Sequence, residues 1–246
     1  MFGIFKNKEN KKNNIFDYSS LMVDMHSHVL PGIDDGAQNP AESIGLIKRM
    51  MKLGITKIIA TPHIMADYYR NTAETINAAL DILKDELKKE NIDIAVEAAA
   101  EHYFDETFEK RIDDRKLMTI GDNYVLYEYS FISQPPNAVQ IIQKLKDSGY
   151  KPILAHPERY QYLDLDHFRS LHDNGLLFQL NTISLTGYYG KESKKLAESL
   201  VDNQLVDFIS SDMHHLRHAE AFQHALKMPY LEKLLFDYPL KNTMLR

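Results

Sequence analysis

The sequence contains no cysteine and no hydrophobic run long enough to cross a membrane. Without cysteine, the protein has no disulfide scaffold, no cysteine-ligated zinc site and no thiolate nucleophile. A membrane-spanning helix needs ~20 consecutive apolar residues, and the first twenty residues, rich in Lys and Asn, lack the continuous apolar segment of a signal peptide. We therefore predict a cytoplasmic protein without a transmembrane segment. Residues 1–20 are expected to form a polar N-terminal arm, the alternative being a segment that docks on a membrane surface or a partner.

The chain also has no excess of positively charged residues. The formal net charge is −6 at pH 7, which argues against a protein that binds nucleic acid by counterion release. Hydrophobic residues make up 44% of the chain and charged residues 26%, proportions that are typical of a globular protein. A chain of 246 residues suits one large α/β domain, which we expect to span residues 21–246.

Apolar runs that fit strands alternate with amphipathic segments that fit helices. Asn39 and Pro40, for example, are typical of the first residues of a helix, whereas the β-branched run at 55–61 is typical of a strand. The expected strands start near residue 23 and cover 55–61, 92–100, 124–127, 150–155, 176–180 and 206–209. The expected helices cover 40–53, 72–91, 106–112, 139–149, a segment around 168–171, 194–203 and 219–236. Seven strand–helix units with short links predict parallel strands joined by right-handed crossovers.

Six of the seven expected strands end in a His, Asp or Glu residue. In an α/β barrel the carboxyl ends of the strands converge on one rim, where the active sites of that architecture lie. An open sheet would spread the same residues along an edge. We therefore predict an α/β fold in which seven strands form a TIM-like (β/α)7 barrel.

The strand-end residues form a set of metal-ligand types. They are His26, His28, Asp35, His63, Glu101, Glu128, His156, Asp212 and His214. Five imidazoles and four carboxylates without a thiolate suit Mn²⁺, Zn²⁺ or Fe²⁺ rather than Ca²⁺ or a soft metal. Catalytic ions take about three protein ligands each, so the set predicts a cluster of two or three ions. Each residue alone has an ordinary structural explanation, such as a hydrogen-bonded histidine or a turn-forming aspartate, but a core has no structural need for six strands to end this way.

Read in order, the motifs resemble those of the polymerase-and-histidinol-phosphatase (PHP) superfamily, and more closely its bacterial protein-tyrosine phosphatases of capsule and exopolysaccharide synthesis. The resemblance covers roughly residues 21–220. The motifs are His26-Ser27-His28 with Asp35, Thr61-Pro62-His63, Glu101, Glu128, Ala155-His156-Pro157-Glu158-Arg159 and Ser211-Asp212-Met213-His214. The resemblance implies a distorted seven-stranded barrel with a trinuclear, often manganese-dependent site, in which these nine His, Asp and Glu residues are the ligands. It also implies that Arg159 contacts phosphate, and Arg217 is the nearest candidate for a second arginine.

Such a site implies hydrolysis of a phosphomonoester. Divalent ions lower the pKa of bound water toward ~7, so a bridging hydroxide can attack phosphorus while the ions and an arginine take up charge. No covalent enzyme intermediate is required, in agreement with the absence of cysteine. Tyr68, Tyr69 and Arg70 either border a pocket for an aromatic phosphoester or belong to an ordinary exposed loop.

The resemblance predicts a metal-dependent protein-tyrosine phosphatase that acts on a phosphotyrosine protein, a tyrosine autokinase of polysaccharide synthesis. One alternative is a small-molecule phosphatase of the histidinol-phosphate type. Another is a non-catalytic metal-binding PHP module, whose expected mark is the loss of several ligands. The sequence lacks none of the nine.

Overall fold

Nine short parallel strands form two sheets in the computed structural model, which describes residues 16–246. The first sheet has the order β1 (Val23–Asp24), β2 (Lys57–Ala60), β4 (Ala95–Ala98). The second has the order β3 (His63–Ile64), β5 (Glu101–Tyr103), β6 (Tyr124–Glu128), β7 (Lys151–Ala155), β8 (Leu177–Asn181), β9 (Phe208–Ser210). Every pairing between these strands is parallel. The predicted α/β class with parallel strands is therefore confirmed.

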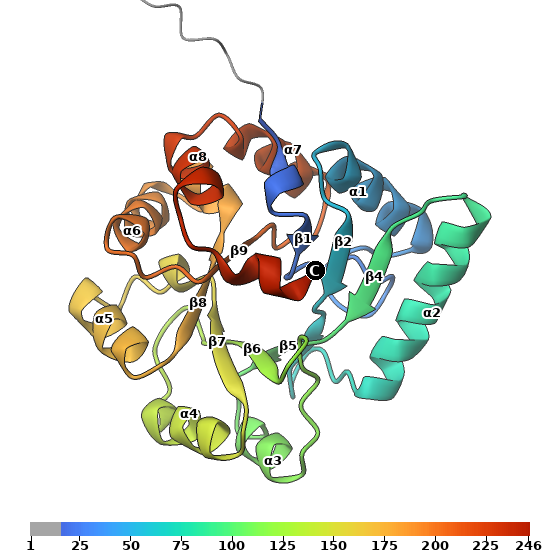
Figure 1. Cartoon of the computed structure of the whole chain (residues 1–246). Coiled ribbons are helices and arrows are strands. Elements are labelled where there is room, and N and C mark those ends of the chain that lie inside the picture. The colour runs from blue at the N-terminus through green and yellow to red at the C-terminus, as the bar shows by residue number, and fades with distance from the viewer. Residues whose placement is uncertain (1–15) are drawn as a thin grey trace, which may run out of the picture.

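Helices surround the strands on the outside of the ring (Figure 1). They are α1 (Pro40–Lys52), α2 (Ala73–Lys89), α3 (Phe108–Asp113), α4 (Ala138–Asp147), α5 (Leu165–Asp173), α6 (Lys191–Asp202), α7 (Leu216–Ala225) and α8 (Pro229–Phe236). Local sequence explains the starts of the first two: the Asn39 side chain accepts a hydrogen bond from the Glu42 N–H before α1, and Thr72 forms a capping box with Thr75 before α2. The single helical region predicted at 219–236 is two helices, because Pro229 starts a new one.

The strand count differs from the prediction of seven. The expected strands at 55–61 and 92–100 end early, and a further short strand follows each of them: Thr61 and Pro62 separate β2 from β3, and Ala99 and Ala100 separate β4 from β5. Proline has no N–H to donate to a neighbouring strand, which explains the first break. The described residues thus form nine strands in two sheets rather than one closed seven-stranded barrel.

The predicted N-terminal arm lies largely outside the described residues, since 1–15 are not among them. Its last residues belong to the folded domain: a 3₁₀ helix, η1, covers Tyr18–Ser20. The Tyr18 ring is fully buried and stacks on Phe222 with 3.9 Å between centroids. Residues 18–20 therefore pack on the rest of the described chain, and the domain boundary at residue 21 stays a prediction.

The chain end closes the amino end of the strand ring. The final 3₁₀ helix, η4 (Lys241–Leu245), lies across the centre of the ring in Figure 1. The Asn242 amide donates to the Ile209 carbonyl oxygen at 2.9 Å. Leu245 joins an inner cluster with Val23, Met25, Ile59, Ala99, Ile120, Tyr124, Leu126, Ile153, Ala155 and Phe208. The candidate functional residues consequently lie at the opposite, carboxyl end of the strands, which η4 does not cover.

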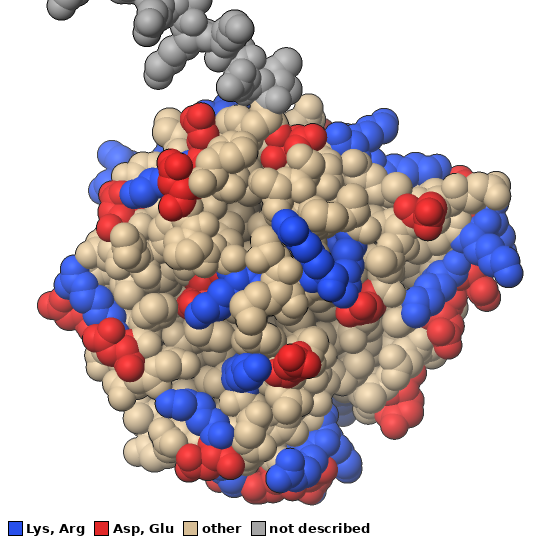
Figure 2. Space-filling model, in the orientation of Figure 1, with Lys and Arg blue, Asp and Glu red and all other residues tan. Residues whose placement is uncertain are grey.

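Strand alternation directs side chains into that opposite end. Tyr124 and Leu126 of β6 are in the inner cluster, and because side chains at i and i+2 share a side of a strand, Glu128 points the same way. On the face shown in Figure 2, which carries η4, Lys and Arg are interspersed with Asp and Glu both near the centre and around the edge. No helix within residues 16–246 combines the length and apolarity that crossing a membrane requires.

Candidate metal centre

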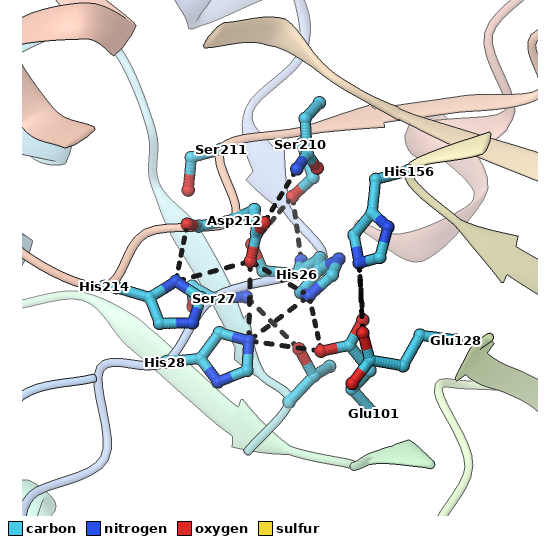
Figure 3. A network of polar contacts seen from close by, with 12 residues as sticks. His26, Ser27, His28, Glu101, Glu128, His156, Ser210, Ser211, Asp212 and His214 are labelled. Carbon is cyan, nitrogen blue, oxygen red and sulfur yellow. Dashed lines mark hydrogen bonds and ion pairs between the residues drawn. The ribbon is translucent and has the colours of Figure 1, made fainter. Parts of the chain in front are cut away.

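Seven of the nine predicted ligands lie at or just beyond the carboxyl ends of strands. The other two, His63 and Glu101, begin the short strands that follow β2 and β4. His26, His28 and Asp35 follow β1, His63 begins β3, Glu101 begins β5, Glu128 ends β6, His156 follows β7, and Asp212 and His214 follow β9. Figure 3 shows the labelled imidazoles and carboxylates of this set pointing toward one another. The structure therefore brings together residues that are almost two hundred positions apart in the sequence.

Glu101 is at the centre of the set and is buried. Its Oε2 atom lies 3.3 Å from His26 Nε2, 3.4 Å from His28 Nε2 and 3.2 Å from His63 Nδ1. Its Oε1 atom lies 3.0 Å from His156 Nε2. One carboxylate thus contacts four imidazoles, as expected for a group that bridges neighbouring ions.

Each of the other three carboxylates also contacts histidines of the set. Asp35 Oδ1 lies 3.5 Å from His63 Nε2 and 3.4 Å from His214 Nε2. Asp212 Oδ1 lies 3.3 Å from His26 Nε2 and 3.5 Å from His28 Nε2. Glu128 Oε1 lies 3.1 Å from His63 Nδ1. Three groups have ligand atoms close enough to hold an ion: His28–Asp35–His63–His214, His26–His28–Glu101 and His63–Glu101–Glu128.

The donor geometry fits divalent metal ions. Two ligand atoms that each lie ~2.1 Å from one ion are roughly 3.0–3.4 Å apart at octahedral or tetrahedral angles, which is the spacing observed between these side chains. His63 Nδ1 is buried without a hydrogen-bond partner, although it lies 3.2 Å from Glu101 Oε2 and 3.1 Å from Glu128 Oε1. Groups that converge on a shared ion rather than on each other have this arrangement.

The electrostatics of the protein alone also favour a bound cation. Burial lowers the pKa of His63, but the charges of Glu128 and Glu101 outweigh burial and raise it to about 9. Burial raises the pKa of the Glu101 carboxyl, whereas the charges of His26 and His63 hold it well below its usual range. Buried carboxylates need compensating positive charge, and metal ions would supply it.

Several residues behind the ligands were not predicted from the sequence. His28 Nδ1 donates to Asp34 Oδ2 at 2.7 Å, and His26 Nδ1 donates to Gln179 Oε1 at 2.8 Å. These bonds leave both Nε2 atoms free to face the site, which is how protein metal sites orient histidine. Gln179 donates in turn to Asn181, whose amide donates to Asp212 Oδ2 at 2.7 Å.

The β9–β1 junction holds the remaining ligands in place. The buried Asp24 carboxylate accepts from Ser210 Oγ at 2.7 Å and from the Ser211 N–H at 2.8 Å. Burial is the main cause that raises the pKa of Asp24 to about 6. His156 and Asp212 adopt left-handed backbone conformations, with φ of 34° and 52°. Such strain in non-glycine residues concentrates at functional sites, where the surrounding structure enforces it.

Arg159 faces the same cavity, which has a volume of about 510 Å³. Its guanidinium lies 4.0 Å from the Phe131 ring centroid and 4.3 Å from that of Tyr189, and its Nη1 atom is 3.8 Å from Asp212 Oδ2. Two aromatic faces restrict the guanidinium to one orientation. The arginine is thus fixed at the edge of the ligand set.

Arg217, in contrast, is not brought to this cavity. It is exposed and lines a separate hollow with Gly45 and Leu46 of α1. His215 and His218 line the candidate metal centre instead, and His218 Nδ1 donates to the Asp212 carbonyl oxygen at 2.9 Å. The expected role of Arg217 therefore has no support from its position.

The tyrosines after His63 divide between two surfaces. Tyr69 lines the metal cavity and stacks on His63 at 5.5 Å with an interplanar angle of 14°. Tyr68 is 79% exposed and lines a neighbouring cavity. The Arg70 Nε–H donates to the Ala66 carbonyl oxygen, so this side chain ties its own loop together. Of the three, Tyr69 fits the pocket prediction.

Replacing Asp34 with asparagine is expected to weaken Mn²⁺ binding by about 10–100-fold, the usual effect of losing the group that orients a ligating histidine. An asparagine side chain at this position would keep the shape but lose the charge-assisted bond to His28. Calorimetric titration of Mn²⁺ into metal-free protein measures the change. Asp81→Asn on the exposed side of α2 is the control, and equal affinities for the two variants would contradict the role of Asp34.

Comparison with known protein families places this geometry in context. A family model described as "Capsular polysaccharide synthesis, CpsB/CapC" matches residues 22–233. The chain is 34% identical over 199 residues to the tyrosine-protein phosphatase YwqE of Bacillus subtilis, covering 80% of this chain and 78% of the relative. It is 27% identical to the tyrosine-protein phosphatase CpsB of Streptococcus pneumoniae, covering 79% and 84%.

A solved structure shares the fold over nearly the whole chain. The match is to the crystal structures of YwqE from Bacillus subtilis and CpsB from Streptococcus pneumoniae, described as unique metal-dependent tyrosine phosphatases. The TM-score is 0.77 at 31% identity, with 89% of this chain and 96% of the other covered. The similarity therefore includes the ring of strands and its carboxyl end.

Proposed function

Because the chain belongs to the CpsB/CapC family of capsular polysaccharide synthesis proteins, we propose that it is a metal-dependent protein-tyrosine phosphatase. The observation that carries this proposal is the convergence of five imidazoles and four carboxylates, seven of which line one cavity together with a fixed arginine. The relatives named as tyrosine-protein phosphatases and the metal-dependent structural match support it. We further propose that the substrate is a phosphotyrosine of a tyrosine autokinase in the cytoplasm.

The nine residues would hold two or three divalent ions, for which we propose Mn²⁺, with Fe²⁺ or Zn²⁺ as the other candidates. Four carboxylates contribute about −4, so three divalent ions would leave an excess positive charge that suits a phosphate dianion, whereas two would only cancel it. The three overlapping ligand groups favour the larger number. When bound, the ions supply a water ionised near neutral pH and positive charge for the phosphoryl oxygens.

The protein's own groups then position the phosphomonoester. The Arg159 guanidinium, held between Phe131 and Tyr189, is oriented to donate hydrogen bonds to phosphate oxygens. Tyr69 also lines this cavity, with its ring nearly parallel to that of His63, where it can pack against an aromatic leaving group. No nucleophilic side chain is needed, so attack by water transfers the phosphoryl group directly and releases tyrosine.

Hydrolysis of a phosphotyrosine peptide by protein purified without chelators tests the proposal. We expect turnover with Mn²⁺, a loss of at least about 100-fold with EDTA, and recovery on adding Mn²⁺. Because ligands stabilise the state that binds them, Mn²⁺ at 1,000 times its Kd adds about 4 kcal/mol. For a domain of this size that corresponds to a rise in Tm of roughly 8–16 °C.

The alternatives give different results in the same assay. Turnover of histidinol phosphate but not of the phosphopeptide would show a small-molecule phosphatase. If the metal-loaded protein hydrolysed no phosphoester, and His156→Ala altered only stability, a non-catalytic metal-binding module would be the correct reading.

We also infer that the nine strands are those of a distorted seven-stranded barrel in which two strands are interrupted. Only two residues separate β2 from β3, and only two separate β4 from β5. Ser27 and Met213 form an isolated parallel bridge between the chain after β1 and the chain after β9. The His28 N–H donates to the Met213 carbonyl oxygen at 2.8 Å. These contacts support closure of the ring next to the candidate metal centre.

A further inference from the structure

A second cavity of about 590 Å³ lies directly beside the candidate metal centre. The two cavities share Met65 and Tyr103 in their walls. We call the second cavity the flanking groove and define it by Met65, Ala66, Asp67, Tyr68, Tyr103, Phe104, Asp105, Glu106, Glu109, Pro135, Asn137 and Ile141. Its walls are the segments that follow β3, β5 and β6 together with the first turns of α4. It is therefore a sideways extension of the site rather than a deeper part of it.

Large apolar side chains are exposed along this path. Tyr68 in the flanking groove is 79% exposed, and Phe131 and Ile132 on the wall of the metal cavity are 46% and 87% exposed. A single exposed apolar side chain needs no explanation. Several of them around two joined cavities are typical of a surface that binds a polypeptide.

The flanking groove is also acidic. Four carboxylates line it, from Asp67, Asp105, Glu106 and Glu109, and no Lys or Arg is among its lining residues. Asp105 is compensated by Arg111 at 3.3 Å, and Glu109 by Lys144 at 2.8 Å. The other two carboxylates, of Asp67 and Glu106, form no ion pair with any residue in the described part of the chain. Negative charge therefore remains for an incoming group.

The metal cavity alone is large enough for a phosphotyrosine side chain, since typical ligand pockets are ~300–1,000 Å³. A small phosphomonoester would leave the flanking groove unused. A polypeptide substrate, in contrast, continues past its phosphotyrosine on both sides, and the flanking groove offers a volume of about 590 Å³ directly beside the metal cavity. The groove is consequently on the scale of a short peptide segment.

Resting on the proposed phosphatase function, we propose that the flanking groove binds the polypeptide segment next to the phosphotyrosine and selects a Lys or Arg side chain in it. Tyr68, Tyr103 and Pro135 contact the backbone and apolar parts of that segment. Asp67 and Glu106 attract its basic side chain. Substrate choice is thus a property of the loops after β3 and β5, whereas the metal centre performs the hydrolysis.

Charge reversal in the groove tests this inference. The double variant Asp67→Lys/Glu106→Lys is compared with Asp81→Lys/Asp85→Lys, which makes the same change in net charge on the exposed side of α2. Three substrates are used: p-nitrophenyl phosphate and two phosphotyrosine peptides that differ only in having Lys or Glu at the flanking positions. For the groove variant we expect kcat/KM for the Lys-flanked peptide to fall at least about tenfold, mainly through KM, while p-nitrophenyl phosphate stays within twofold. The Glu-flanked peptide is expected to improve, and the α2 variant to retain the wild-type preference.

In the activity assay, two results would overturn the inference: equal kcat/KM of the wild type for both peptides, or a parallel loss on all three substrates in the groove variant. Binding of the same peptides with a non-hydrolysable phosphonate in place of phosphotyrosine separates this inference from the proposed function. Absence of turnover by the metal-loaded wild type would refute the proposed phosphatase function. Equal affinity for Lys-flanked and Glu-flanked phosphonate peptides would refute peptide selection by the flanking groove, whether or not the protein is a phosphatase.

Discussion

Replacing Glu101 with glutamine is expected to lower kcat for a phosphotyrosine peptide by at least about 10³-fold, or roughly 4 kcal/mol of transition-state stabilisation. Glu101 contacts His26, His28, His63 and His156 at 3.0–3.4 Å, so its charge acts on four imidazoles at once. Glutamine preserves the shape but presents one neutral oxygen and an NH₂ group that repels cations. It therefore removes a shared ligand without leaving a void.

Metal content distinguishes this role from a structural one. We expect the Glu101→Gln protein to bind at least one ion fewer per chain than the wild type, measured by elemental analysis after preparation without chelators. Glu97→Gln on β4 is the matched control, because Glu97 forms only an exposed ion pair with Lys57 at 2.8 Å, and such pairs contribute about 0–1 kcal/mol. Wild-type metal content and kcat within tenfold of the wild type in Glu101→Gln would show that Glu101 is not a shared ligand.

The sequence was sufficient to predict that these nine His, Asp and Glu side chains converge, because two simple periodicities bring them together; that they bind metal ions stays a prediction. Alternation along a strand assigns Tyr124, Leu126 and Glu128 to one side, and repeated strand–helix units bring strand ends to one rim. Neither inference needs long-range contacts. The ligand set therefore follows from local patterns, although its members are far apart in the chain.

The supporting residues could not be found in this way. Gln179 and Asn181 are on β8, whose end carries no His, Asp or Glu, yet they connect His26 to Asp212. Their role depends on which strands are neighbours in the ring, and that is a tertiary property. The adjacent pair Asp34 and Asp35 is similar: only the fold shows that the first orients His28 while the second faces the site.

The positions of residues that follow the strands also could not be predicted from the sequence alone. Arg217 was expected near phosphate, but it lies in the first turn of α7 and lines a hollow with residues of α1. The short strands β3 and β5, which begin at His63 and Glu101 just past the ends of the expected strands 55–61 and 92–100, were not predicted. Departures from regular strands are common next to active sites. In this protein they occur where the ligands are placed.

Substituting Gly36 with alanine is expected to disrupt the loop that carries Asp34 and Asp35. A Cβ atom at Gly36 would lie 2.0 Å from the His28 carbonyl oxygen and 2.4 Å from its Cβ atom, closer than real Cβ contacts. The loop would have to move away, breaking the bond from the Ala37 N–H to the His28 carbonyl oxygen at 3.0 Å. Because Asp34 orients His28, the displacement would reach the ligand set.

We expect Gly36→Ala to lower stability by about 1–3 kcal/mol through overpacking, which is a fall in Tm of roughly 2–12 °C, and to lower Mn²⁺-dependent phosphatase activity by at least about 100-fold. Thermal unfolding with EDTA present measures the first effect without a contribution from bound metal. The control is Gly45→Ala in α1, where an added Cβ would meet nothing within 4 Å and alanine is favoured in a helix by up to ~1 kcal/mol. That variant is expected to be as active as the wild type and slightly more stable. If Gly36→Ala instead matched Gly45→Ala in activity and Tm, the close approach of this loop to His28 would not be what positions Asp34 and Asp35.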